Sequence, residues 1–186
     1  EQAGFIMSKL RQAIRLLNEH IADSNPSGEF SKYFNLEELF QSETATRKGI
    51  INKPSKAQEV QLREISKIVL DPIREHFGEP IKVTSGYRSP KLNEVIGGSS
   101  KSQHMAKNGD CAVDFKFLGN KIDLQECFDW ITKDSKIVYD QCISEFLPDG
   151  WIHISYVSAG KPNRGKKTIA SKVQGKTVYK HIGSKS

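Results

Sequence analysis

Apolar residues recur every three or four positions near the start of the chain, between Phe5 and Ile21, which is the stripe of an amphipathic helix. Turn-forming serine, asparagine, proline and glycine then dominate residues 23–29, a composition typical of a linker. We therefore expect a helix and linker over residues 1–29. The helix can pack on the domain, dimerise or continue a longer parent chain, and we favour packing.

A second helical pattern covers residues 55–76, where Ser55 and Gln58 have the spacing of a capping box and Gly78 supplies a stop. We expect six of its apolar side chains to face the core. These are Val60, Ile65, Ile68, Val69, Ile73 and Phe77. A shorter helix is expected after Ser89, because serine is a favoured N-cap and the proline that follows it suits the first helical position.

Short runs of apolar and β-branched residues, the pattern of strands, occur after residue 80. They cover residues 81–84, 112–117, 138–146 and 151–157, and a capped helix is expected after Asp123. Two further runs, 168–173 and 176–182, are separated by Gln174 and Gly175 and predict a terminal hairpin. Strands and helices alternate irregularly, which favours an α+β fold over a doubly wound sheet.

The composition is that of one globular domain with its own core, since 37% of the 186 residues are hydrophobic and 27% are charged. No segment has the ~20 apolar residues of a membrane span, and we expect none. The N-terminal residues lack the pattern of a signal peptide. Because the chain begins at Glu1 and not at methionine, we expect a cut or processed fragment.

The net charge of +6 comes from the end of the chain, because residues 161–186 contain eight Lys or Arg and no Asp or Glu. We expect residues 166–186 to form a basic C-terminal hairpin or tail beside a central domain at residues 30–165. Such a segment can be an ordinary solvated surface or bind an anionic polymer. Tyr179 is its single Phe, Trp or Tyr, so a nucleic-acid channel is disfavoured.

The three cysteines form no C-x-x-C pair, so neither a disulfide framework nor a thiolate zinc site is indicated. We expect Cys111, Cys127 and Cys142 to be small buried hydrophobic residues. A Cys–His nucleophile is a weaker alternative.

Three side chains that commonly bind metals lie near the middle and end of the chain, at His104, Asp114 and His153. Two imidazoles and one carboxylate suit a catalytic zinc site whose fourth position is left for water. The step from His104 to Asp114 is ten residues, and Asp110 lies within it as an alternative carboxylate. The sequence therefore predicts a zinc hydrolase.

A hairpin near the second histidine can place a further carboxylate at this site. Residues 148–150 fit a three-residue loop with Gly150 in the left-handed region. In that register Glu145 lies directly opposite His153, and we expect it to act as general base. A four-residue loop would instead place Glu145 opposite Ile152, and the pairing would be lost.

Arg88 lies between the expected strand at 81–84 and the helix that Ser89 caps. Its guanidinium could bind a substrate carboxylate in bidentate fashion, stabilise an oxyanion, or anchor the loop through an ion pair. Spacing alone leaves these roles open.

Several segments occur in a characteristic order. They are Ser85-Gly86-Tyr87-Arg88-Ser89-Pro90, Gly97-Gly98-Ser99, Ser102-Gln103-His104, Ala112-Val113-Asp114 and Trp151-Ile152-His153-Ile154-Ser155. Together they resemble the zinc D-alanyl-D-alanine peptidases of the hedgehog-like LAS superfamily, over roughly residues 34–165. That family usually has seven positions from its first histidine to its aspartate, where this chain has ten.

The resemblance implies an α+β fold of the hedgehog/DD-peptidase type, in which a small antiparallel sheet carries the zinc site and helices pack on it. It also implies a role for six residues. His104, Asp114 and His153 would be zinc ligands, Glu145 the general base, Arg88 a catalytic and substrate-binding group, and Ser102 a second substrate-binding group.

We therefore expect a zinc metallopeptidase that cleaves an amide bond in peptidoglycan stem peptides, as a D,D-carboxypeptidase or as a cell-wall-lytic endopeptidase of the endolysin kind. It would act at the bacterial cell wall, and phage origin or membership of a larger virion or wall-lytic assembly is left open. The alternative is a non-catalytic, zinc-stabilised module that binds cell wall or serves virion structure. A nucleic-acid role for residues 161–186 is the weakest candidate.

Overall fold

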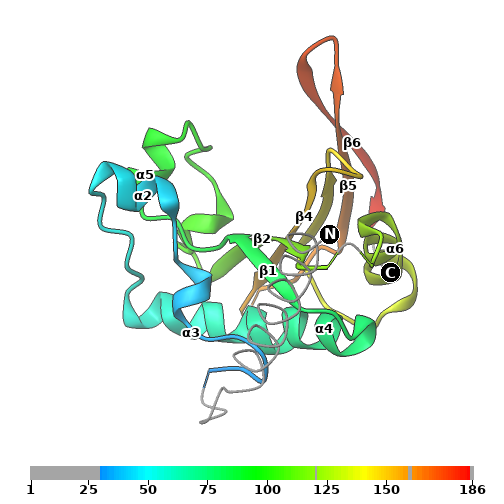
Figure 1. Ribbon diagram of the computed structural model, residues 1–186, viewed down its shortest axis with the longest axis horizontal. Coiled ribbons are helices and arrows are strands. Elements are labelled where there is room, and N and C mark those ends of the chain that lie inside the picture. The colour runs from blue at the N-terminus through cyan, green and yellow to red at the C-terminus, as the bar shows by residue number, and fades with distance from the viewer. Residues whose placement is uncertain (1–29, 120, 159–160, 185–186) are drawn as a thin grey trace, which may run out of the picture.

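The computed structural model describes residues 30–119, 121–158 and 161–184. The helix expected at residues 5–21 and its linker lie outside these ranges. Within them, a six-stranded sheet carries helices packed against it (Figure 1), which confirms the α+β class. None of the helices in the described ranges has the length and apolar character needed to cross a membrane.

The sheet has the strand order β1-β2-β4-β3-β5-β6. The strands are β1 (Ile81–Ser85), β2 (Asp110–Phe117), β3 (Gln141–Glu145), β4 (Trp151–Val157), β5 (Lys166–Val173) and β6 (Lys176–Ser184). Neighbouring strands are antiparallel except β3 and β5, which are parallel. The parallel pair departs from the expected antiparallel sheet, because β5 reverses the direction of β4 but pairs on the far side of β3.

The long helical pattern forms α3 (Lys56–Ile65), a π-helical segment η2 (Ser66–Leu70) and α4 (Asp71–Phe77) in succession. The capping box of Ser55 and Gln58 and the left-handed C-cap at Gly78 are confirmed. The buried stripe consists of Leu62, Ile65, Val69, Leu70 and Ile73.

Two of the six side chains expected to face the core from this helix do not do so. Val60 is 49% exposed and Ile68 is 37% exposed. Ile65 is five positions after Val60, an offset of about 140° around the helix axis, so the two side chains point in different directions. Leu62, three residues before Ile65, occupies the inward position instead.

The shorter helices are α2 (Glu43–Lys48), α5 (Pro90–Val95) and α6 (Leu124–Asp129), with single turns η1 (Glu37–Leu39), η3 (Gln103–Met105) and η4 (Trp130–Asp134). Ser89 caps α5 and Asp123 caps α6, as their sequences predict. The core lies between the helices and one face of the sheet, and its β2 members are Cys111, Val113, Phe115 and Phe117. Asp114 alternates with them and so points to the other face.

The terminal hairpin is confirmed, since Gln174 and Gly175 both have positive φ angles, 49° and 77°, as a two-residue turn requires. In Figure 1 the β5–β6 hairpin, coloured orange to red, projects beyond the other strands. Because β5 is hydrogen-bonded to β3, the hairpin continues the same sheet. The division into parts at 1–29, 30–165 and 166–186 stays a prediction.

The three cysteines are buried, as expected. Burial raises the pKa of the Cys111 and Cys127 thiols, which disfavours thiolate chemistry at either position.

Candidate metal centre

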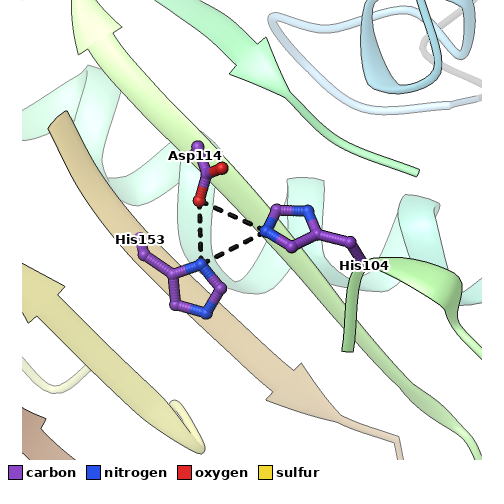
Figure 2. A group of neighbouring side chains, drawn as sticks. All are labelled: His104, Asp114 and His153. Atoms are coloured by element: carbon purple, nitrogen blue, oxygen red, sulfur yellow. Dashed lines mark hydrogen bonds and ion pairs between the residues drawn. The ribbon is translucent and has the colours of Figure 1, made fainter. Parts of the chain in front are cut away.

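The side chains of His104, Asp114 and His153 converge on one point, from η3, β2 and β4 respectively (Figure 2). His104 Nε2 lies 3.3 Å from His153 Nδ1 and 3.3 Å from Asp114 Oδ1. His153 Nδ1 lies 2.8 Å from the same Asp114 oxygen. Three potential donor atoms from distant parts of the chain therefore form a small triangle.

The dimensions of this triangle suit a zinc ion. Zinc binds histidine nitrogen and carboxylate oxygen at about 2.0–2.2 Å, so neighbouring ligand atoms around a tetrahedral ion lie about 3.3 Å apart. Two edges of the triangle already have that length, and the third is shorter. The donor types and their spacing fit a three-ligand zinc site with one coordination position left over.

Sheet pairing and a second hydrogen bond hold the ligands in place. Asp114 and His153 are direct partners in the β2–β4 ladder, so their side chains share one face. His104 Nδ1 lies 2.8 Å from the carbonyl oxygen of Gly86. If Nδ1 carries the proton and donates it to that carbonyl, Nε2 keeps its lone pair for a metal.

Gly86 can make this contact because it has no side chain. A Cβ atom built there would lie 2.1 Å from the carbonyl oxygen of Leu39 in η1. The Tyr87 amide donates to the same Leu39 oxygen at 2.6 Å, which holds the Gly86 segment close to η1. The Arg88 amide donates to the His104 carbonyl at 2.9 Å, so a hydrogen bond joins the segment after β1 to η3.

Helix α3 contacts the ten-residue segment between the first two potential ligands, His104 and Asp114. The Gln58 side chain, which completes the capping box, donates through Nε2 to the Met105 carbonyl at 3.1 Å. Asp110, the alternative carboxylate, pairs with Val157 at the start of β2 and accepts from the Asn108 amide at 3.3 Å. It is not part of the ligand triangle.

Burial and neighbouring charges favour the protonation states that a metal needs. Burial lowers the pKa of His104, and the charge of Asp114 opposes it only in part. Burial by itself would raise the pKa of Asp114, but His104 and His153 outweigh it and hold that pKa well below its usual range. A neutral imidazole and an ionised carboxylate are the metal-binding forms.

The triangle opens into a cavity of about 480 Å³. Arg88, Ile143, Glu145 and Trp151 line it beside the three ligands, and Lys166, Thr168 and Tyr179 line it from β5 and β6. The site is therefore an open pocket that could admit a substrate.

The expected pairing of Glu145 with His153 is wrong. Glu145 pairs with Trp151, and Ile143 pairs with His153. Residues 146–150 form the loop, with Phe146 in the left-handed region (φ 55°) in place of the expected Gly150. The reason is a long-range contact: the Phe146 amide donates to the Ala170 carbonyl oxygen in β5 at 3.0 Å. The backbone at Phe146 is therefore hydrogen-bonded to β5 and not to β4.

The shift nevertheless keeps Glu145 at the site. The observed register differs from the expected one by two residues, and side chains two apart on a strand share a face. Glu145 is half-buried and lines the cavity. Burial raises its pKa, and the charges of His153 and Arg88 oppose the shift only in part.

Arg88 forms the loop-anchoring ion pair that was one of its three possible roles. Nη2 donates to Asp114 Oδ2 at 3.0 Å and Nε donates to Ser85 Oγ at 2.9 Å. Arg88 also lines the cavity. Ser102 is half-buried just before η3 and is not among the residues that line the cavity, so its substrate-binding role stays a prediction.

Sequence reasoning assigned no role to Lys166, Thr168 and Tyr179. Lys166 and Thr168 reach the cavity through the parallel pairing of β3 with β5, and Tyr179 follows through the pairing of β5 with β6. The β3–β5 pairing joins segments that are separated in the chain, so it leaves no local pattern. Burial raises the pKa of Tyr179, and the charges of Glu145 and Asp114 raise it further. The phenol therefore stays protonated at neutral pH and can donate a hydrogen bond.

The comparisons with known proteins agree with this geometry. The family model of peptidase M15 matches residues 32–155, about two thirds of the chain. The matched region contains the three potential ligands and Glu145, and it ends before β5. A search of curated proteins gave no match.

Proposed function

The chain belongs to the peptidase M15 family, and from this premise we propose that it is a zinc peptidase that hydrolyses an amide bond in peptidoglycan stem peptides. The observation that carries the proposal is the triangle of His104, Asp114 and His153 in an open cavity beside Glu145. D,D-carboxypeptidase and endopeptidase activity both fit this cavity. The site of action would be the bacterial cell wall.

The zinc ion would be held by His104 Nε2, Asp114 Oδ1 and His153 Nδ1. When bound, zinc supplies Lewis acidity to a scissile carbonyl and lowers the pKa of a water molecule toward about 7. The ion pair with Arg88 keeps the Asp114 carboxylate oriented, because Arg88 occupies Oδ2 and leaves Oδ1 toward the two histidines.

Glu145 would be the general base. Its carboxylate would accept a proton from the attacking water and pass it to the leaving nitrogen, so the amine departs neutral. Burial raises the Glu145 pKa, which makes the carboxylate a stronger base than an exposed glutamate.

Arg88 would also bind substrate. A guanidinium has five N–H donors, and two of its three nitrogens are engaged with Ser85 and Asp114. The remaining donors are available to polarise a peptide carbonyl beside the metal.

The experiment is digestion of purified peptidoglycan by the zinc-loaded chain, followed by mass analysis of the released fragments. Loss of a terminal alanine would identify a carboxypeptidase, and separation of cross-linked stems an endopeptidase. We expect Glu145→Gln to retain zinc but lose activity by roughly 10²-fold or more. Glu126→Gln, at an exposed carboxylate on α6, is the matched control and should remain active.

The opposite results define the alternative function. A chain that binds zinc and melts at a higher temperature with it, yet releases no fragment, would be a zinc-stabilised binding or structural module. A Glu145→Gln variant as active as the parent would remove the proposed base.

A further inference from the structure

Strand β5 extends the face of the sheet that carries the ligand triangle. Residues that pair directly across neighbouring strands present their side chains on the same face. Asp114 pairs with His153, His153 with Ile143, and Ile143 with Thr168. Thr168 therefore lies in the same transverse row as two of the proposed metal ligands.

The rows on either side of this one add two more residues from the hairpin. Lys166 pairs with Gln141, and it lies two residues before Thr168, about 7 Å along the strand on the same face. On the other side, Tyr179 of β6 pairs with Ala170, the partner of Glu145. The hairpin thus forms one wall of the cavity, and this wall lies outside residues 32–155 that match the family.

Arg88 and Lys166, the Lys and Arg side chains that the described residues contribute to the cavity lining, differ in their ion pairing. Arg88 is paired with Asp114. Lys166 is half-buried, and among the residues that the structure describes its ammonium has no acidic partner within ion-pair distance. Of these two side chains, Lys166 is therefore the one whose charge is not already paired with a carboxylate of the described residues.

Two residues of the same cavity lining carry buried hydrogen-bonding atoms that have no partner within the described ranges. Thr168 is 5% exposed, and within the described ranges its Oγ1 atom has no hydrogen-bond partner. The Nε1 atom of Trp151 is also buried without a partner there. Since buried polar atoms are nearly always hydrogen-bonded in native proteins, these two groups indicate a lining shaped for a polar ligand.

We propose that the wall formed by Lys166 and Thr168 is a subsite for a carboxylate of the substrate, distinct from the amide that is cleaved. Lys166 would form a charge-assisted hydrogen bond with the carboxylate and Thr168 would supply a second donor. The subsite deepens the proposed peptidase function and rests on it. It also assigns substrate charge recognition to Lys166, because the Arg88 guanidinium already holds Asp114.

This subsite differs from a general attraction of the basic hairpin for anionic polymers. Lys167 is the neighbour of Lys166 on β5 and carries the same charge, but side chains alternate along a strand, so it faces away from the cavity. A diffuse electrostatic effect would depend on both lysines equally. A subsite depends on Lys166 alone.

The experiment measures binding of two synthetic stem peptides of one sequence, the first with free carboxylates and the second with those carboxylates converted to neutral carboxamides. Dissociation constants are measured by calorimetry on the zinc-loaded full chain carrying Glu145→Gln, which slows turnover enough for binding to be measured. We expect the free-carboxylate peptide to bind roughly tenfold more tightly, the effect of one charge-assisted hydrogen bond. Adding Lys166→Gln should abolish that preference, Lys166→Arg should restore it, and Lys167→Gln should leave it intact.

Equal affinity for the two peptides, no binding of either, or an unchanged preference in the folded Lys166→Gln variant would overturn the subsite. Equal losses from Lys166→Gln and Lys167→Gln would also overturn it in favour of a diffuse effect. Hydrolysis by the chain with Glu145 intact is assayed separately. Charge-selective binding without hydrolysis contradicts the proposed peptidase but not the carboxylate site, whereas hydrolysis of both peptides without any charge preference contradicts only the subsite.

Discussion

Glu145 pairs with Trp151 across β3 and β4, which places the Glu145 carboxylate on the same face of the sheet as His153 but two residues along it. This offset keeps Glu145 outside the ligand triangle while it lines the same cavity. A carboxylate in that position can accept and donate protons without acting as a metal ligand. The strand register would thus assign proton transfer and metal binding to different residues.

The pH dependence of hydrolysis tests this role. The proposed base Glu145 can accept a proton only when ionised, and burial raises its pKa above the ordinary value of 4.5. As the pH falls, kcat/KM should therefore begin to decline at a higher pH than an exposed glutamate would give. Zinc content is measured at each pH, so that the decline of kcat/KM caused by protonation of Glu145 can be distinguished from a decline caused by loss of metal. The same acid limb in the residual activity of Glu145→Gln would contradict the assignment.

Gly86→Ala tests how the backbone holds His104. The new Cβ would meet the Leu39 carbonyl oxygen, so the segment whose carbonyl faces His104 Nδ1 must shift. We expect a loss of about 1–3 kcal/mol in the free energy of unfolding and a roughly 10–100-fold weaker zinc affinity. Urea denaturation and zinc titration measure the two effects.

Gly119→Ala is the matched control, because its Cβ would meet only the end of the Glu79 side chain, at 3.0 Å. That side chain can move aside, so both quantities should stay near those of the parent. If Gly86→Ala were no worse than Gly119→Ala in zinc affinity, the Gly86 contact would not be what orients His104.

Arg164 and Asp140 link the segment before β5 to the turn that carries His104. Asp140 is 2% exposed and accepts from Arg164 Nε at 2.7 Å and from Gln103 Nε2 at 2.9 Å. Burial alone would raise the Asp140 pKa, but these hydrogen bonds outweigh it and lower the pKa. The ionised carboxylate thus stabilises the folded protein.

Arg164→Met should lower the free energy of unfolding by about 1–2 kcal/mol at neutral pH, a value reduced for the exposure of the arginine. Because the Asp140 pKa is lower in the folded state, its contribution is complete above the ordinary value of 3.8 and is lost as the pH falls through the folded value. The parent and the variant should therefore converge in strongly acidic solution. Arg47→Met, on the exposed surface of α2, should differ little from the parent at any pH.

Local signals in the sequence predicted the helix ends well. Ser55, Ser89 and Asp123 cap helices as expected, and Gln174 with Gly175 forms the expected turn. These features depend on residues within a few positions of one another. They can therefore be recognised without knowledge of the fold.

Long-range pairing set the features that the sequence did not predict. The loop after β3 begins at Phe146, whose amide donates to the Ala170 carbonyl in β5, and Lys166 reaches the cavity through the parallel pairing of β3 with β5. The convergence of His104, Asp114 and His153 was expected from the chemistry of zinc sites and from resemblance to a family. Neither source describes the wall formed by β5 and β6.

The most direct test of the account is the zinc stoichiometry after equilibrium dialysis, measured by elemental analysis of the folded full chain. We expect one zinc ion per chain in the parent and in Asp110→Asn, and far less than one in His153→Ala, which removes one proposed ligand. Circular dichroism verifies that each variant is folded. A parent without zinc, or a His153→Ala variant that retains one zinc with the affinity of the parent, would contradict the proposed metal centre.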